Sequence, residues 1–178
     1  MLRMTTYVGF LRAINLGATR KFPKEAIVAA TEAAGFSEVA THINTGNVRL
    51  GTRMRSRARI ESALEQAYRH DRGFEVPTIV YTAAELRAIA DDADRFAHGH
   101  DGKHYIWLLK DEPSASLRAE LEGLSAGQER VRLSPRAVHL LLDGGYLDAT
   151  LLKPIEKQIG VATNRNVTVV RALVQKWC

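Results

Sequence analysis

The chain has 178 residues, of which 46% are hydrophobic, and this is enough for one ordinary domain or for two small domains packed together. It contains no apolar run of about 18 residues, which a membrane helix would need, and its first residues lack the apolar stretch of a secretory signal. The one cysteine, Cys178, is the last residue and has no second thiol with which to form an internal disulfide. These features predict a cytoplasmic protein with no membrane partner.

The charge is distributed unevenly along the chain. The formal net charge is +5 and the pI is about 9.6. The first 82 residues contain 12 Lys or Arg against 7 Asp or Glu, whereas residues 83–112 contain 4 against 7. The first part therefore permits an anionic partner, and the middle of the chain does not favour one.

The first elements are predicted from short apolar patterns. Residues 6–14 are rich in strand formers and predict a buried strand, followed by a loop over residues 15–22. Pro23 suits the first turn of a helix, and Gly35 suits the position just after its end. The pattern predicts a strand, a loop and a helix in that order.

A hairpin and a second helix follow. Residues 39–43 and 48–50 flank Asn44-Thr45-Gly46-Asn47, whose Gly and Asn tolerate the positive φ angles of tight turns. A regular apolar stripe from Ser56 onward predicts a helix. Residues 74–81 predict another strand, and Pro77 confines it to the edge of a sheet because proline has no N–H to donate.

The order β-α-β-β-α-β is that of the split β-α-β arrangement called ferredoxin-like. In this topology the first and third strands are antiparallel neighbours and the last strand lies at an edge. The N-terminal domain is expected to cover residues 1–95, with the sequence Thr82-Ala83-Ala84-Glu85 as a capping box that opens a linking helix.

The second half of the chain repeats the pattern after a polar connector over residues 96–103. Strands are expected at 104–109, 129–133 and 137–142, and helices at 116–124 and about 149–159. Residues 164–177 fit a helix by spacing and a strand by their β-branched residues, and a helix is favoured. The prediction is an α+β protein of two ferredoxin-like halves, of which the second (103–178) is incomplete and ends in a helix.

The predicted topology brings two polar motifs to one end of the first sheet. Arg12 and Asn15 end the first strand, and the turn before the third strand lies beside them. A guanidinium, amide side chains and the free N–H groups of the following helix suit an anion. The expected ligand-binding residues here are Arg12, Asn15, Arg20, Lys21, Thr45, Gly46 and Asn47.

These residues also have a purely structural interpretation, which stays open. The asparagines could bond their own loop backbones, Gly46 could serve only the turn, and Arg12 could be a satisfied edge residue.

Several of the motifs resemble a known family. Phe10-Leu11-Arg12-Ala13-Ile14-Asn15-Leu16-Gly17, His42-Ile43-Asn44-Thr45-Gly46-Asn47-Val48 and the C-terminal Arg165-Asn166 are similar to the bacterial family catalogued as domain of unknown function 1697. The resemblance covers nearly the whole chain. It implies a compact α+β protein and carries no established activity.

The chain departs from the family's pattern at several positions. The family has glycine where Ala13 and Ala18 stand, glutamine where Asn44 stands, and an aromatic residue in the stretch after Arg165-Asn166. Of the C-terminal motif, the resemblance therefore implies only Arg165 and Asn166 as ligand-binding residues.

The sequence gives weaker indications of metal binding, nucleic-acid binding or catalysis. The histidines His98, His100 and His104 with Asp101 match no established metal-ligand spacing and suit a solvated loop, so no metal and no cofactor are expected. No RNA-binding aromatic motif, phosphate-binding glycine loop or nucleophile motif is present in the sequence. The prediction is a binding protein for a small anionic or phosphorylated ligand. The alternatives are an interaction module, in which the basic first half meets nucleic acid or an acidic protein, and an enzyme whose general base is not identified.

Overall fold

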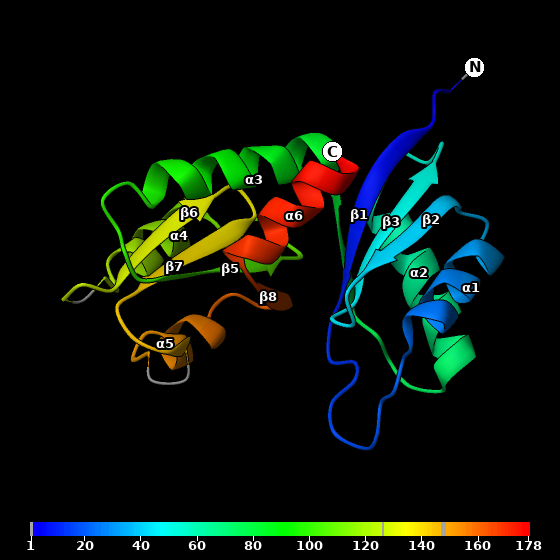
Figure 1. Ribbon diagram of the computed structural model, residues 1–178, viewed down its shortest axis with the longest axis horizontal. Coiled ribbons are helices and arrows are strands. Elements are labelled where there is room, and N and C mark those ends of the chain that lie inside the picture. The colour runs from blue at the N-terminus through cyan, green and yellow to red at the C-terminus, as the bar shows by residue number, and fades with distance from the viewer. Residues whose placement is uncertain (1, 126, 147–148) are drawn as a thin grey trace. The chain divides into compact units, whose positions relative to one another are not determined.

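The computed structural model describes residues 2–125, 127–146 and 149–178, and the chain divides into two compact units. The first unit runs to residue 86 and includes residues 177–178, and the second covers residues 87–176. Each unit is an α+β structure built on one four-stranded antiparallel sheet (Figure 1). Among the described residues, no helix combines the length and the apolar character that a bilayer crossing requires.

The first sheet has the strand order β2-β3-β1-β4. As predicted, β1 is antiparallel to β3, and β4 lies at an edge. The elements of this unit are β1 (Thr5–Leu11), α1 (Lys24–Ala33), β2 (Ser37–His42), β3 (Asn47–Thr52), α2 (Arg57–Arg72) and β4 (Thr78–Thr82).

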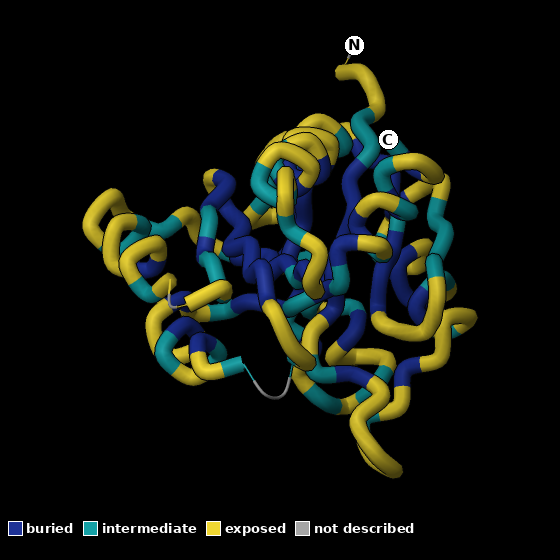
Figure 2. The backbone as a smooth tube through the Cα atoms, turned by 60° about the vertical axis from the view of Figure 1, so that its left-hand side comes forward, coloured by how far each residue is buried: buried dark blue, intermediate teal, exposed yellow. Residues whose placement is uncertain are grey.

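Helices α1 and α2 cover one face of this sheet (Figure 1). Their apolar side chains pack with those of β1 and β3 into one core, while exposed residues gather in loops and on the outer sides of the helices (Figure 2). Phe22 and Tyr68 are fully buried and meet edge to face, with ring centroids 5.2 Å apart. The loop before α1 is therefore anchored in the core by an aromatic side chain.

The outer edge of β4 is covered by carboxylates. The N–H groups of Thr78, Val80 and Thr82 alternate along the strand, and each donates to a glutamate. Glu65 and Glu61 of α2 accept at 2.9 and 3.1 Å, and Glu85 accepts at 2.8 Å. An exposed strand edge invites pairing with another chain, and these side chains occupy its donors.

The second sheet has the order β6-β7-β5-β8. Its antiparallel pairs repeat those of the first sheet. The remaining elements are α3 (Ala83–Phe96), β5 (Lys103–Leu109), α4 (Ala115–Glu122), β6 (Arg130–Ser134), β7 (Ala137–Leu142), α5 (Leu152–Glu156), β8 (Ala162–Asn166) and α6 (Val167–Trp177).

The second sheet corrects one prediction. The half was expected to be incomplete, with a helix over residues 164–177, but β8 supplies a fourth strand and the helix starts only at Val167. The sequence of β8, Ala-Thr-Asn-Arg-Asn, has no apolar alternation. Its strand conformation is fixed by pairing with β5, which a local pattern cannot reveal.

The two sheets end their first strands in the same way. Leu11 donates its N–H to the Gly46 carbonyl at 2.8 Å, and Leu109 donates to the Arg136 carbonyl at 2.9 Å. The N–H of the next residue donates to the carbonyl of the residue just before the edge strand. Arg12 donates to Pro77 before β4, and Lys110 donates to Val161 before β8. The repeat seen as a pattern in the sequence is thus a repeat of backbone hydrogen bonds.

The helices that follow the two edge strands are both capped by a side chain. The predicted capping box is confirmed, since Thr82 N–H donates to Glu85 and Glu85 N–H donates to Thr82 Oγ1. At the equivalent position of the second sheet, Asn166 Oδ1 accepts from the N–H of Thr168 at 2.9 Å. Both edge strands therefore pass directly into a helix.

One face of the second sheet carries a buried chain of polar side chains. Asp92 of α3 accepts a hydrogen bond from Ser134 Oγ at 2.7 Å, and Ser134 Oγ lies 2.8 Å from His139 Nε2. His139 Nδ1 lies 3.0 Å from His104 Nε2. The three strand residues share one face because side chains alternate along a strand.

Burial sets the charge of the two histidines. It lowers the pKa of His104 to about 4, with further lowering by Arg171 and His100 and an opposing effect of Asp94. It lowers the pKa of His139 to about 3, with help from His104 and Arg95. Both imidazoles are neutral at pH 7.

Replacement of Glu61 by Leu tests the covered edge. Glu61 is 3% exposed, and its loss leaves the buried Val80 N–H without this acceptor. We expect the free energy of unfolding to fall by about 1.5–3 kcal/mol, measured by urea denaturation. Gln66→Leu, at an exposed position of the same helix, is the control and should change stability by less than about 0.5 kcal/mol.

The histidine pair predicts a loss of stability in acid. The folded pKa values lie below the unfolded value of 6.5, so the unfolded chain binds more protons as the pH falls. Stability is therefore complete above about pH 6.5 and declines toward pH 4, by up to about 1.4 kcal/mol per pH unit for each histidine. Urea unfolding at a series of pH values measures this, and the decline should be smaller in His139→Gln. An equal decline in both proteins would contradict the assignment.

Candidate functional site

The candidate site lies where the end of β1 meets the hairpin between β2 and β3. Gly46 approaches β1 so closely that a Cβ atom on it would lie 2.9 Å from Leu11 Cβ and 3.0 Å from Ile14 Cδ1. Its φ of 78° is also one that favours glycine. The hairpin turn and the loop after β1 are therefore in direct contact, as the sequence predicted.

Left-handed backbone conformations gather in these two segments. Ala13, Asn15, Arg20 and Ile43 have φ values between 51° and 58°, and Glu38 is the other non-glycine residue with positive φ among the described residues. Ile43 is β-branched, for which this conformation is a true outlier, and the residue is 46% exposed. Such strain is characteristic of functional loops, and here the fold maintains it at one end of one sheet.

Asn15 closes the loop. Its Oδ1 accepts from the N–H of Phe22 at 2.8 Å, and its Nδ2 donates to the carbonyls of Phe22 and Asn44 at 3.2 and 3.1 Å. The Asn15 side chain thus joins the start of the loop to its end and to the hairpin. Its amide is committed to the protein backbone.

Arg20 is a second internal clamp. Its Nε donates to the Ala13 carbonyl at 2.6 Å, and Nη2 donates to the Glu75 carbonyl at 2.5 Å. The guanidinium lies over the Phe74 ring, 4.5 Å from the centroid. Arg20 therefore holds the loop to the segment that precedes β4.

The hairpin residues mainly serve the turn. Asn47 is fully buried, and its Nδ2 donates to the His42 carbonyl at 3.0 Å and to Thr45 Oγ1 at 2.8 Å. Thr45, Gly46 and Asn47 lie next to the loop, but none of them lines the hollow described below.

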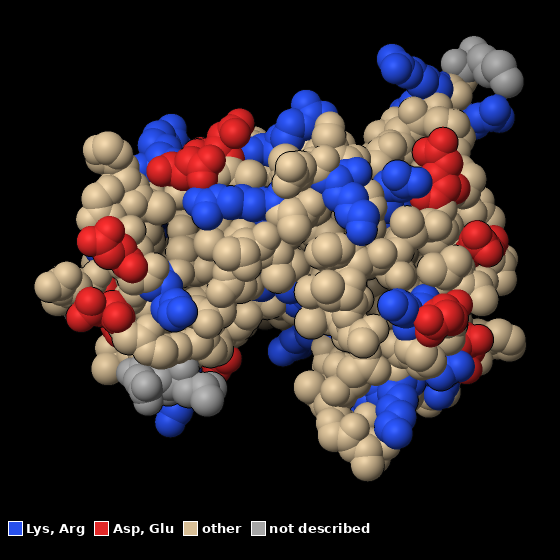
Figure 3. All heavy atoms as spheres, viewed as in Figure 1, with Lys and Arg blue, Asp and Glu red and all other residues tan. Residues whose placement is uncertain are grey.

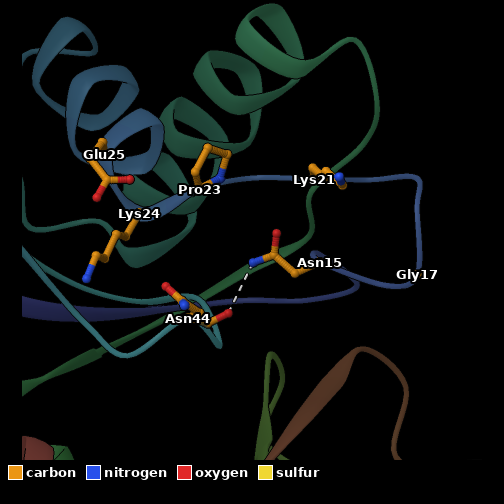
Figure 4. Close-up of a pocket in the computed structure, with 7 residues that line it drawn as sticks. All are labelled: Asn15, Gly17, Lys21, Pro23, Lys24, Glu25 and Asn44. Carbon is orange, nitrogen blue, oxygen red and sulfur yellow. Dashed lines mark hydrogen bonds between the residues drawn. The ribbon is translucent and has the colours of Figure 1, made fainter.

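A hollow of about 510 Å³ opens between the loop, the hairpin and the start of α1. In Figure 4 the Asn15 side chain reaches Asn44, and Lys21 and Lys24 lie on either side of this contact. The lining residues are Asn15, Gly17, Lys21, Pro23, Lys24, Glu25 and Asn44.

Helix α1 begins at this hollow without a side-chain cap. Its N-cap residue is Pro23, which makes no side-chain cap hydrogen bond, and the first helical bond runs from Ile27 N–H to the Pro23 carbonyl. The N–H groups of residues 24–26 therefore have no acceptor among the described residues. They carry the positive end of the helix dipole toward the hollow.

The lining carries a small positive charge. Lys21 and Lys24 are exposed cations and Glu25 is the one acidic lining residue, so the net formal charge is +1. Lys and Arg side chains gather over the lower part of this unit, where the loop between β1 and α1 lies, with acidic groups beside them (Figure 3). Arg12 is exposed and lies outside the lining.

The structure thus divides the predicted residues into groups. Asn15 and Lys21 line the hollow, whereas Arg20, Thr45, Gly46 and Asn47 shape the segments around it. Sequence reasoning named Asn44 but did not place it in the site, and it missed Lys24. The signal for Lys24 was present: it follows directly on Pro23, the predicted start of the helix.

The C-terminal residues lie in the second unit. Arg165 is 8% exposed, its Nη1 donates to Thr163 Oγ1 and to the Asn164 carbonyl, both at 2.8 Å, and burial lowers its pKa to about 10. Asn166 caps α6. Over the described ranges, no three His, Cys, Asp or Glu side chains are grouped to hold a metal ion.

The fold and this site define an α+β protein with a polar hollow at the end of its first sheet. The chain belongs to the family described as "Protein of unknown function (DUF1697)", whose model matches residues 4–139. It is similar in structure to "conserved bacterial protein SP0830 from Streptococcus pneumoniae", with a TM-score of 0.78 and 18% sequence identity over 97% of this chain and 98% of that one. No curated protein matches the chain. The structural similarity supports the fold.

Replacement of Gly46 by Ala tests the close approach between hairpin and strand. The new Cβ would be strained by the positive φ and would also overlap Leu11, so we expect a loss of about 2–4 kcal/mol in the free energy of unfolding. Gly73→Ala is a matched control, because Gly73 has a φ of 77° and no atom within 4 Å of the new Cβ. It should cost only about 1–2 kcal/mol. Equal losses in urea denaturation would show that the contact does not matter.

Proposed function

We propose that the protein binds a small anionic or phosphorylated ligand in the hollow at the start of α1. The observation that carries the proposal is the uncapped helix N-terminus, which opens onto a hollow flanked by Lys21 and Lys24. Unpaired backbone N–H groups and a helix dipole attract an anion, and two ammonium groups add charge where the anion would lie.

The surrounding hydrogen bonds support a preorganised site. Asn15 and Arg20 fix the loop with their side chains, so the N–H groups and lysines are presented by a backbone that is already ordered. Preorganisation lowers the entropy lost on binding. The net charge of +1 suits one anionic group rather than a long polyanion.

The fold classification is part of the same proposal. The strand order with the fourth strand beside the first supports assigning both units to the ferredoxin-like class. A cytoplasmic location is supported by the single cysteine.

Titration with inorganic pyrophosphate, followed by amide NMR, tests the site. We expect the signals of Lys24, Glu25 and Ala26 to shift most, because their N–H groups face the ligand. Lys24→Ala should weaken binding about fivefold or more, whereas Glu25→Gln should strengthen it by removing a repulsive charge. Arg12 lies outside the lining, so Arg12→Ala should weaken binding less than Lys24→Ala.

Two results would contradict the proposal. One is that pyrophosphate binds without shifting the signals at the start of α1. In that case replacement of Lys157, an exposed cation of the second unit, by Ala would weaken binding as much as Lys24→Ala. The other is a steep fall in affinity with salt, because one pocketed anion gives a shallow dependence and a nucleic-acid backbone a steep one. The second result would favour the interaction module.

A further inference from the structure

With Asp92 ionised, the hydrogen-bond chain of the second unit is satisfied by one arrangement of protons. The single hydroxyl proton of Ser134 goes to the Asp92 carboxylate, so Ser134 Oγ must accept from His139 Nε2–H. A neutral His139 then has a lone pair on Nδ1, which accepts from His104 Nε2–H. The neutral His104 consequently has a bare lone pair on Nδ1.

That last nitrogen has no partner. Nδ1 of His104 is buried and makes no hydrogen bond to any described residue, and His104 as a whole is only 5% exposed. Buried polar atoms are almost always paired, so such an acceptor needs an explanation. The chain back to Asp92 prevents His104 from turning Nδ1 into a donor without rearranging every bond.

His104 lines a second hollow, of about 300 Å³, at the start of α6. Lys103, Arg171, Val167 and Thr168 also line it. Arg171 donates to Asp94 through Nε and Nη2 at 3.0 and 2.6 Å, and the charged or titratable groups that act on His104 are Arg171, His100 and Asp94. Lys103 adds a positive charge, and α6 directs the positive end of its dipole here.

We propose that this hollow is a second ligand site, which binds a phosphate group in its protonated form, with the P–O–H donating to His104 Nδ1. The charged phosphate oxygens lie toward Lys103, Arg171 and the start of α6. His104 lines the hollow and its Nδ1 is buried, so we expect the donor to approach this nitrogen from the hollow. Asp92, Ser134 and His139 are positioning residues, because their hydrogen bonds keep Nδ1 of His104 an acceptor.

This arrangement predicts discrimination between two anions of similar shape. Phosphate at about pH 6 still carries protons, whereas sulfate carries none. Sulfate would bring an acceptor against the bare nitrogen of His104, so phosphate should bind at least about tenfold more tightly. The hollow at α1 also has an acceptor in its lining, the Glu25 carboxylate, so the discrimination is measured with that site weakened.

Calorimetric titration of the full chain tests this, in a Lys21→Ala/Lys24→Ala background that weakens the first site. We expect phosphate to bind and sulfate to bind at least about tenfold more weakly at about pH 6. His104→Phe and Ser134→Ala should each abolish the preference, and His98→Phe, at an exposed position outside the hollow, should retain it. Methyl phosphate, compared with inorganic phosphate, distinguishes a monoester ligand from the free ion.

Long-range proton–nitrogen NMR of the imidazoles gives a measurement that needs no variant. In the free protein His104 should carry its proton on Nε2, and the Nδ1 signal should move on addition of phosphate and stay unchanged with sulfate. A proton on Nδ1 in the free protein, equal affinities for the two anions, or no binding of phosphate would each overturn the proposal.

Discussion

The close contact between Gly46 and the end of β1 is the constraint on which the N-terminal site depends. Only a residue without a side chain allows the hairpin turn to lie against Leu11 and Ile14, and its carbonyl then receives the Leu11 N–H. This contact places Asn44 within reach of Asn15, whose amide ties the loop to the hairpin. The hollow at the start of α1 is a consequence of these backbone distances, since its walls are the segments that the contact joins.

The second unit reaches the same strand geometry with different side chains. Where the first unit has Gly46, the second has Arg136, and its hairpin is held by Arg118 of α4, which donates to the Ser134 carbonyl at 3.0 Å. A helix side chain thus secures the turn that left-handed loop residues secure in the first unit. The second unit instead concentrates buried polar groups on the face of its sheet, between α3 and β5.

Much of this architecture could be predicted from local patterns. The edge position of β4, the Thr82–Glu85 capping box and the antiparallel pairing of β1 with β3 were predicted from the sequence. Pro77 was predicted to lie inside a strand over residues 74–81, but β4 begins after it, at Thr78. Strand β8 could not be predicted, because polar residues such as Asn164 and Asn166 become a strand only through pairing with β5. The role of Arg20 was also hidden, since its partners are the carbonyls of Ala13 and Glu75, far apart in the sequence. The spacing of motifs predicts which segments lie side by side. It does not predict which side chains form hydrogen bonds within the protein and which line the site.

The glutamates along β4 have a consequence for association between molecules. A strand from another copy could extend the first sheet at β4 only by offering carbonyls to the outward N–H groups of Thr78, Val80 and Thr82, and these already donate to carboxylates. Displacing Glu61 would also take from a buried carboxylate the hydrogen bond that it accepts from Val80. Addition of a strand at this edge, by which many β-structures polymerise, is therefore energetically unfavourable for this protein.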